Sequence, residues 1–339
     1  MVNKKSVGMA LLGFLFLWLF LRVIDIEQVW QLWGKTDGRL LALSGITYLG
    51  AYYLRSLRWR LLLLEVGEAL SRGIVFTTYM AGLVINYLVP IRLGEFAKSC
   101  FLKTQTGLPV ARTLPTVFID KLLDLSPVVV LLLALPCFSW QQSVLFQGLV
   151  FTLAALFFLA LFILWLAIRK AARCEALLGK LAVFFPKAYK ERYLSFVTRF
   201  VSGVALLGHL SLWKGLCLAL YTLCILAADG LYLWLAFCAV GSHVPYYSVF
   251  LGYILLNLTY ILPTPPAQVG SNEVVSLLIF STLLGMEKNV VALVMTITHI
   301  MSGAIILMVG YFSLNLIGVG LWDWQKNLSD DTAKENAAG

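Results

Sequence analysis

Tyr87-Leu88-Val89-Pro90-Ile91-Arg92-Leu93-Gly94-Glu95 places a proline, an arginine, a glycine and a glutamate inside one of the most apolar parts of this chain. The apolar run 74–89 leads into this stretch, and a run of only ten residues, 96–105, leads out of it. Ten residues of helix extend about 15 Å, whereas the hydrocarbon core of a bilayer is about 30 Å thick. The second run is therefore too short to cross a membrane, and the pattern predicts a re-entrant helical hairpin with this stretch at its tip.

The composition is that of an integral membrane protein. Of the 339 residues, 60% are hydrophobic and 13% are charged, whereas soluble domains are about half apolar and a quarter charged. The net charge of +9 fits cytoplasmic loops and contact with anionic lipids, and we expect no nucleic-acid partner. The apolar segments leave no room for a soluble domain of about 100 residues.

The apolar segments predict an all-α membrane protein. About six of them are long enough to be transmembrane helices: 6–21, 40–57, 113–137, 144–168, 213–240 and 289–320. A second re-entrant hairpin is predicted from 244–262 and 274–284, which enters the membrane from the side opposite to the first. Lysines before the first span and the basic loops predict cytoplasmic N- and C-termini.

We expect residues 1–322 to form a single polytopic membrane domain, followed by a polar tail, 323–339. A basic connector, about 169–211, separates a first repeat, about 40–137, from a second, about 213–320. The connector carries a net charge of +6 between residues 169 and 199. It is either helical and partly on the membrane surface, or a solvated loop.

The repeat rests on matching residues in the two predicted tips. Tyr87 and Pro90 recur 173 residues later as Tyr260 and Pro263, and Glu95 recurs 178 residues later as Glu273. Because the two hairpins enter from opposite sides, the pattern predicts an inverted repeat. Inverted repeats with broken helices that meet near the bilayer midplane are typical of secondary transporters.

Three motifs resemble the membrane domain of lysylphosphatidylglycerol synthases and of the stand-alone, flippase-like proteins that share it. They are the first tip (86–95), the segment 116–124, and the second tip (263–273). The resemblance covers about residues 8–320. It implies translocation of a lipid across the bilayer, without the aminoacyl-transfer domain of the fused relatives. Asp120-Lys121 stands where Glu-Arg is usual, and Pro266-Ala267-Gln268 where Pro-Gly-Gly is usual, so the lipid stays open.

The first hairpin and the following span carry the charges that we interpret as the main part of a lipid site. These residues are Arg92, Glu95, Lys98, Asp120, Lys121 and Asp124. A charge at membrane depth costs about 3 kcal/mol on insertion scales, so it normally faces a partner or a cavity. Arg92, with Lys98 or Lys121, would meet an anionic headgroup, because a guanidinium donates two parallel hydrogen bonds to phosphate. The carboxylates would hold these cations. An internal salt-bridge network that only pins the hairpin is the alternative, and one network could do both.

The second tip adds further residues to the predicted lipid site: Pro263, Gln268, Gly270, Asn272 and Glu273. Other residues are predicted to shape the two tips: Asn86, Pro90, Gly94, Pro265 and Pro266. Helix N-termini exposed by such breaks can receive an anion. Asn272 is equally suited to cap a helix. Asp229 and His299 are lone polar residues in their spans, either packed and satisfied or part of a proton relay.

No hydrolase, transferase, nucleotide-binding or metal motif is present, so we expect no catalytic residue, metal or cofactor. The leading hypothesis is a flippase-like carrier of an anionic phospholipid or lipid-linked headgroup, in a prokaryotic plasma membrane. One alternative is an intramembrane enzyme that modifies a lipid headgroup with Glu95, Asp120 and Asp124. Another is an accessory subunit of a glycosyltransferase or a lipid-modifying enzyme. A homo-oligomer is compatible with all three.

Overall fold

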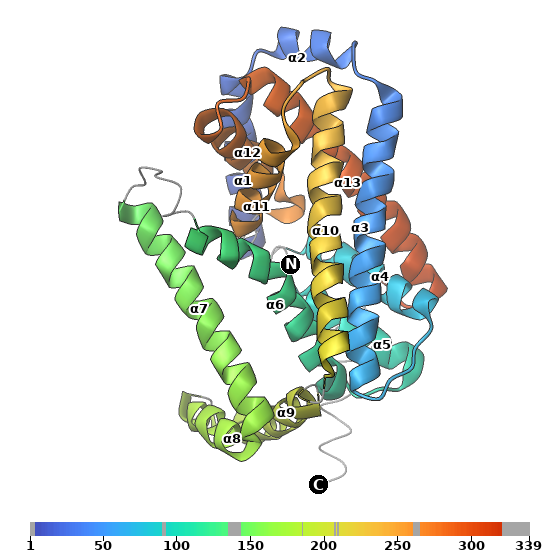
Figure 1. Cartoon of the computed structure of the whole chain (residues 1–339), viewed down its shortest axis with the longest axis vertical. Helices are drawn as coiled ribbons and strands as arrows, with labels where there is room; N and C mark the ends of the chain where they lie inside the picture. Colours follow the sequence, from blue (N-terminus) through green and yellow to red (C-terminus); the bar gives the residue numbers. More distant parts are fainter. Residues whose placement is uncertain are drawn as a thin grey trace. The chain divides into compact units, whose positions relative to one another are not determined.

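The computed structural model consists of helices joined by short connections (Figure 1). It describes residues 4–89, 93–134, 144–184, 186–206, 208, 210–259 and 265–320. In this part of the chain every regular element is a helix, in agreement with the predicted all-α fold. The chain forms two compact units: unit 1 consists of Met1–Arg55, Phe76–Phe101 and Leu223–Gly339, and unit 2 of Ser56–Val75 and Leu102–Thr222.

Most helices lie entirely within one or the other of the two units. Those in unit 1 are α1 (Lys4–Val23), α2 (Ile26–Trp33), α11 (Tyr246–Thr259), η4 (Pro266–Gln268), α12 (Ser271–Ser276), the π-helix η5 (Leu277–Leu283) and α13 (Lys288–Leu316). Those in unit 2 are α6 (Val110–Ala134), α7 (Val144–Arg169), α8 (Ala171–Lys180), η2 (Leu181–Phe184) and α9 (Lys187–Leu206). Four helices have residues in both units: α3 (Gly38–Glu65), α4 (Arg72–Leu88), α5 (Gly94–Thr106) and α10 (Leu212–Ala239).

The six predicted spans correspond to helices α1, α3, α6, α7, α10 and α13. Among the described residues, α10 and α13 are long and apolar enough to cross a membrane, by length and composition. Their 28 and 29 residues correspond to about 42 Å of helix, more than the hydrocarbon core requires. Helix α3 continues to Glu65, beyond the predicted end of its span at Leu57.

Helices α4 and α5 form the first hairpin, and their arms agree closely with those predicted. The backbones of the two helices are in direct contact at Gly82 of α4 and Gly94 of α5, which face each other and have no side chains to separate them. The side-chain oxygen of Asn86 accepts a hydrogen bond from the Gly94 backbone N–H at 2.7 Å, and its amide donates to Glu95 at 3.0 Å. Asn86 therefore joins the end of α4 to the start of α5, and its oxygen satisfies one of the free donors of that helix terminus.

The second hairpin consists of α11 and the broken arm α12–η5, which packs against α11. The Phe280 ring of η5 lies against Gly252 of α11, so a larger residue at position 252 would separate the arms. Both hairpins thus use a glycine for close contact. Their depth in a membrane and their opposite insertion stay predictions.

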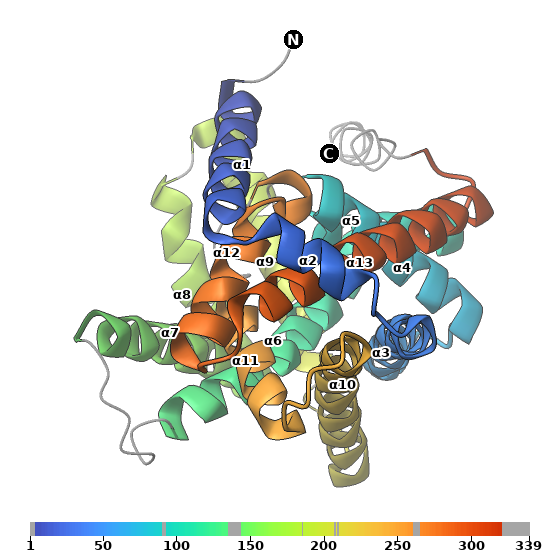
Figure 2. The ribbon, with the colours of Figure 1, turned by 90° about the horizontal axis from the view of Figure 1, so that it is seen from above.

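Helix α13 is the common support in unit 1. It contacts α2, α12 and η5, and its Gly303 and Gly310 face Tyr87 and Val84 of α4. Small residues at such contacts let helix backbones approach closely, as is usual within membranes. Figure 2 shows α13 running from α12 towards α4, so this helix links the two hairpins.

In unit 2 the predicted basic connector is helical. Helices α8 and α9 pack against each other and against α7, around buried Cys174, Val197 and Val201. The 3-10 turn between them exposes Val183 and Phe184, which are 80% and 83% accessible. The connector is therefore folded into helices, and its position on the membrane surface stays a prediction.

Candidate functional site

Helix α13 holds the second tip through His299. The Nε2 atom of His299 lies 2.7 Å from the carbonyl oxygen of Ala267, and its Nδ1 atom contacts Oε1 of Glu273. Ala267 belongs to η4 and Glu273 to α12. A single imidazole therefore fastens two segments of the second tip to α13.

The backbone around Ala267 is strained. Ala267 and Gln268 have φ angles of 53° and 59°, and Gly270 has 76°. This left-handed region suits glycine but costs other residues about 1–3 kcal/mol each, so it persists only where the surroundings hold it. The Gln268 backbone N–H donates to the Pro265 carbonyl at 2.8 Å, and Ser271 donates from its hydroxyl to the Gln268 carbonyl at 3.0 Å. Together with His299, these bonds keep the tip in its strained form.

Three buried oxygens follow on α12. Asn272 Oδ1, Glu273 Oε2 and Ser276 Oγ have no hydrogen-bond partner within the described part of the chain. Glu273 is 6% exposed and Ser276 is 0% exposed. Leaving a buried polar atom unpaired costs about 1–3 kcal/mol. Residues 272, 273 and 276 are neighbours on the helix surface, so this turn of α12 can accept hydrogen bonds from a ligand.

The polar residues of the first tip satisfy one another instead. The Lys98 ammonium lies 2.6 Å from Oε2 of Glu95 and 3.5 Å from the centre of the Tyr79 ring. Asn86 donates to the other Glu95 oxygen. Lys98 is only 1% exposed, so its charge is stabilised by a carboxylate and by an aromatic face. This predicted site residue already has internal partners.

Tyr87 connects the two tips. It stands at the end of α4, and its ring lies against Gly303 of α13, where an added Cβ would come 3.0 Å from Cζ. Since His299 and Gly303 are four residues apart, they share one face of α13. Both tips thus meet on that face.

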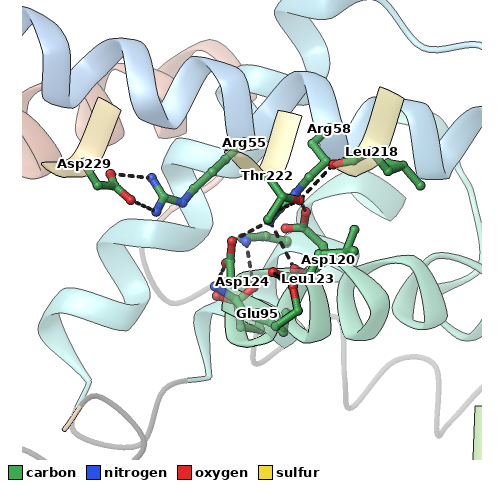
Figure 3. A network of polar contacts seen from close by, with 12 residues as sticks. Arg55, Arg58, Glu95, Asp120, Leu123, Asp124, Leu218, Thr222 and Asp229 are labelled. Atoms are coloured by element: carbon green, nitrogen blue, oxygen red, sulfur yellow. Dashed lines mark hydrogen bonds and ion pairs between the residues drawn. The ribbon is translucent and has the colours of Figure 1, made fainter. Parts of the chain in front are cut away.

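Asp229, predicted as a lone polar residue, has a partner in unit 1. Its carboxylate accepts two hydrogen bonds from the Arg55 guanidinium, at 3.1 and 2.5 Å (Figure 3). The Arg55 side chain is 13% exposed and that of Asp229 is 5% exposed. This is a bidentate pair, the strongest geometry for arginine and a carboxylate.

Unit 2 buries an arginine that the sequence did not single out. Arg58 donates to Asp120 at 2.8 Å, to Asp124 at 2.5 Å and to the Thr222 hydroxyl at 3.1 Å (Figure 3). Its side chain is 0% exposed. Lys121 lies 3.3 Å from the second oxygen of Asp124. The two aspartates that we assigned to the lipid site thus hold Arg58.

Within each unit, the structure brings several of the predicted residues into contact. Asn86, Glu95 and Lys98 form one group, and Asp120, Lys121 and Asp124 belong to another, in unit 2. Pro90, Arg92 and Pro263 lie outside the described residues, and Pro266 is described by its backbone alone. Sequence reasoning missed the pairing of Arg58 and the link through Tyr87. The one available signal was that two acidic residues on α6 outnumber its single nearby lysine.

The chain is similar to known membrane proteins. A family model described as the lysylphosphatidylglycerol synthase TM region matches residues 6–310. The UPF0104 membrane protein MJ1595 of Methanocaldococcus jannaschii is 21% identical over 321 residues, which are 92% of this chain and 95% of the relative. Glycosyltransferase AglD of Haloferax volcanii is 25% identical over 119 residues, which are 35% of this chain and 19% of that protein. No solved structure matches the chain.

Proposed function

The chain belongs to the lysylphosphatidylglycerol synthase transmembrane-region family, and we propose that it carries an anionic phospholipid or a lipid-linked headgroup across the bilayer. The family is a lipid-related family of membrane proteins, which agrees with the apolar helices of unit 1. The transport activity, the hairpin site and the inverted repeat are our proposals.

The observation that carries this proposal is the meeting of two broken helical hairpins on α13. Tyr87 of the first hairpin and Glu273 of the second both contact this helix, at Gly303 and His299. Secondary transporters bind their substrates where two discontinuous helices meet, because such breaks expose polar groups inside an apolar protein. A lipid headgroup needs such a polar route, whereas its acyl chains can stay in the bilayer.

We assign different tasks to the two tips. Arg92, placed by sequence in the first tip, is suited to the phosphate, because it stays charged and donates in parallel. The unpartnered oxygens of Asn272, Glu273 and Ser276 are suited to hydroxyl or ammonium hydrogens of the headgroup. A headgroup that combines phosphate with such donors fits both tips. Lys98 and Glu95 would shape the first tip from within.

A reconstitution assay tests the proposal. The purified protein is placed in phosphatidylcholine–phosphatidylglycerol vesicles with a trace of phosphatidylglycerol that carries NBD on one acyl chain. Dithionite bleaches label in the outer leaflet only, so translocation makes the inner label accessible. We expect Arg92→Ala to lower the rate of translocation about tenfold or more, because a hydrogen bond to a charged group is worth about 1.5–3 kcal/mol. Arg39→Ala, at an exposed position of α3, is the matched control. Unchanged rates in both Arg92→Ala and Glu95→Ala would refute the site.

The partial similarity to AglD supports a second candidate, in which the chain presents a lipid-linked substrate to a glycosyltransferase. The similarity covers 119 residues, which are only 19% of that protein. Mass spectrometry of the vesicle lipids and addition of a co-purified enzyme separate the cases. A chemically altered lipid indicates an enzyme, and translocation only when the enzyme is present indicates an accessory subunit.

A further inference from the structure

The contacts of His299 fix the number of protons in its pair with Glu273. Nε2 faces the Ala267 carbonyl oxygen at 2.7 Å, and a carbonyl oxygen can only accept a hydrogen bond, so Nε2 carries a hydrogen. Nδ1 faces Glu273 Oε1, and this contact needs one more proton, on either the nitrogen or the oxygen. The pair in this structure therefore holds one proton that it can lose.

Loss of that proton has a structural consequence. The Nδ1 lone pair and a carboxylate oxygen would then face each other as two acceptors, and the contact would become repulsive. Glu273 would be released from α13, while Ala267 would keep its bond to Nε2. The strained backbone at Ala267 and Gln268 would then lose part of the framework that holds it.

Titratable groups on the helices around the pair have other partners or are exposed. On α2, Asp25 accepts hydrogen bonds from the helix terminus, while Glu27 is exposed. On α1, Arg22 lies over the Trp18 ring. The tyrosines of the neighbouring helices are Tyr232, which donates to the Thr298 carbonyl, Tyr246, which donates to the Ala227 carbonyl, and Tyr253, which interacts with Asp229. Tyr87 of α4 lies against Gly303, on the same face of α13 as His299.

The other buried carboxylates that were candidates for a relay differ from Glu273 in their partners. Asp229 is paired with Arg55, and Asp120 and Asp124 with Arg58. Arginine stays protonated at any physiological pH, so these pairs contain no proton that can be lost. Glu95 is paired with Lys98 and with the Asn86 amide.

We propose that the Glu273–His299 pair is the site of a second substrate, the proton, which is taken up from one side of the membrane and released to the other in each lipid transport cycle. This inference rests on the proposed function. Glu273 holds α12 on α13 when the pair has its proton and releases α12 when the proton leaves, while Ala267 stays bonded to His299. Only a proton moves: it leaves Nδ1 or Oε1 for water, and no other bond is made or broken.

The first experiment reads the proton directly and needs no transport. The chain has three histidines, so ring-nitrogen NMR of the protein labelled with ¹⁵N-histidine gives few signals, which His209→Gln and His243→Gln assign. We expect His299 to show one protonation step that Glu273→Gln displaces. The signal of His243, which is exposed, should be the same in both proteins. A His299 signal that titrates identically in Glu273→Gln would overturn the inference.

The second experiment couples this site to lipid movement, in the vesicles described above with a pH-sensitive dye inside. An imposed gradient of one pH unit should change the rate of translocation by up to about tenfold, with proton movement reported by the dye. His299→Gln and Glu273→Gln should lose this response, and His243→Gln should keep it. If the wild-type protein translocates lipid at a rate that does not depend on the pH gradient, the coupling is refuted but the proposed lipid transport is not. If the pair titrates but no lipid moves, both the proposed lipid transport and its coupling to protons are refuted, and the pair is only a site that binds a proton.

Discussion

The two units each bury a cluster of charged side chains, and the clusters differ in the permanence of the charge. In unit 2, Arg58 is 0% exposed and donates hydrogen bonds to Asp120, Asp124 and Thr222. In unit 1, Glu273 is paired with the imidazole of His299, and the other Glu273 oxygen has no partner among the described residues. The guanidinium of the first cluster stays charged at physiological pH, whereas an imidazole can gain or lose a proton.

We interpret the first cluster as part of the scaffold and propose the second as a site. A guanidinium held by two carboxylates fixes three helices in one arrangement, and breaking it leaves a charge in an apolar interior. An imidazole, in contrast, can gain or lose a proton near physiological pH. Burial of a charged side chain therefore does not by itself suggest a function. Whether its partner can lose a proton is the more informative property.

The comparison predicts the largest loss of stability for Arg58→Met. The substitution leaves Asp120, which is 1% exposed, without its guanidinium, and removing one partner of a buried ion pair costs about 3–5 kcal/mol. Unfolding in mixed detergent micelles measures the free energy. Arg39→Met, at an exposed position of α3, should change it by less than about 0.5 kcal/mol. Equal effects of the two substitutions would remove the distinction between the clusters.

Asp229→Asn should have an intermediate effect, about 2 kcal/mol, the value of hydrogen bonds to a charged group. Asparagine keeps one acceptor for Arg55, and the Arg55 side chain is 13% exposed, so water can hydrate part of the guanidinium. The same unfolding measurement applies. A loss as large as that of Arg58→Met would mean that this pair, too, belongs to the scaffold.

Gly94→Ala tests whether the first hairpin is rigid at its tip. A Cβ at position 94 would collide with the Gly82 carbonyl oxygen and lie 2.6 Å from the Asn86 side chain. Backbone cannot yield as a side chain does, so we expect a loss of about 1–3 kcal/mol. Gly50→Ala has nothing within 4 Å and should be neutral or slightly stabilising. Thermal unfolding of both variants distinguishes a tight contact from a general effect of glycine replacement.

Glu273→Gln should affect stability least, by about 1 kcal/mol or less, the net value of one hydrogen bond. Glutamine still offers an oxygen or an amide to His299, and the substitution removes a buried charge. Asp229→Asn is the matched exchange of carboxylate for amide, and it should cost more. If Glu273→Gln unfolds the protein, the pair is a scaffold element and not a site that can change state.

Much of the secondary structure follows from local sequence. The apolar runs predicted the long helices, because the length of a run sets the length of chain that can be helical within a membrane. The stretch from Pro90 to Gly94 predicted the break between α4 and α5. The resemblance to the lysylphosphatidylglycerol synthase membrane domain is confirmed by the family match over residues 6–310. These features depend on neighbouring residues or on contiguous motifs, which the sequence displays directly.

The partners of the charged residues were decided by the tertiary structure. Arg58 and Asp120 are 62 positions apart, and Arg55 and Asp229 are 174 apart. His299 looked isolated within its span, although its partner is only 26 positions away on another helix. A helix sequence shows which face is polar but not which helix will cover that face. Only packing places a proton donor against a particular acceptor, and that pairing distinguishes an ion pair of the scaffold from a site for a proton.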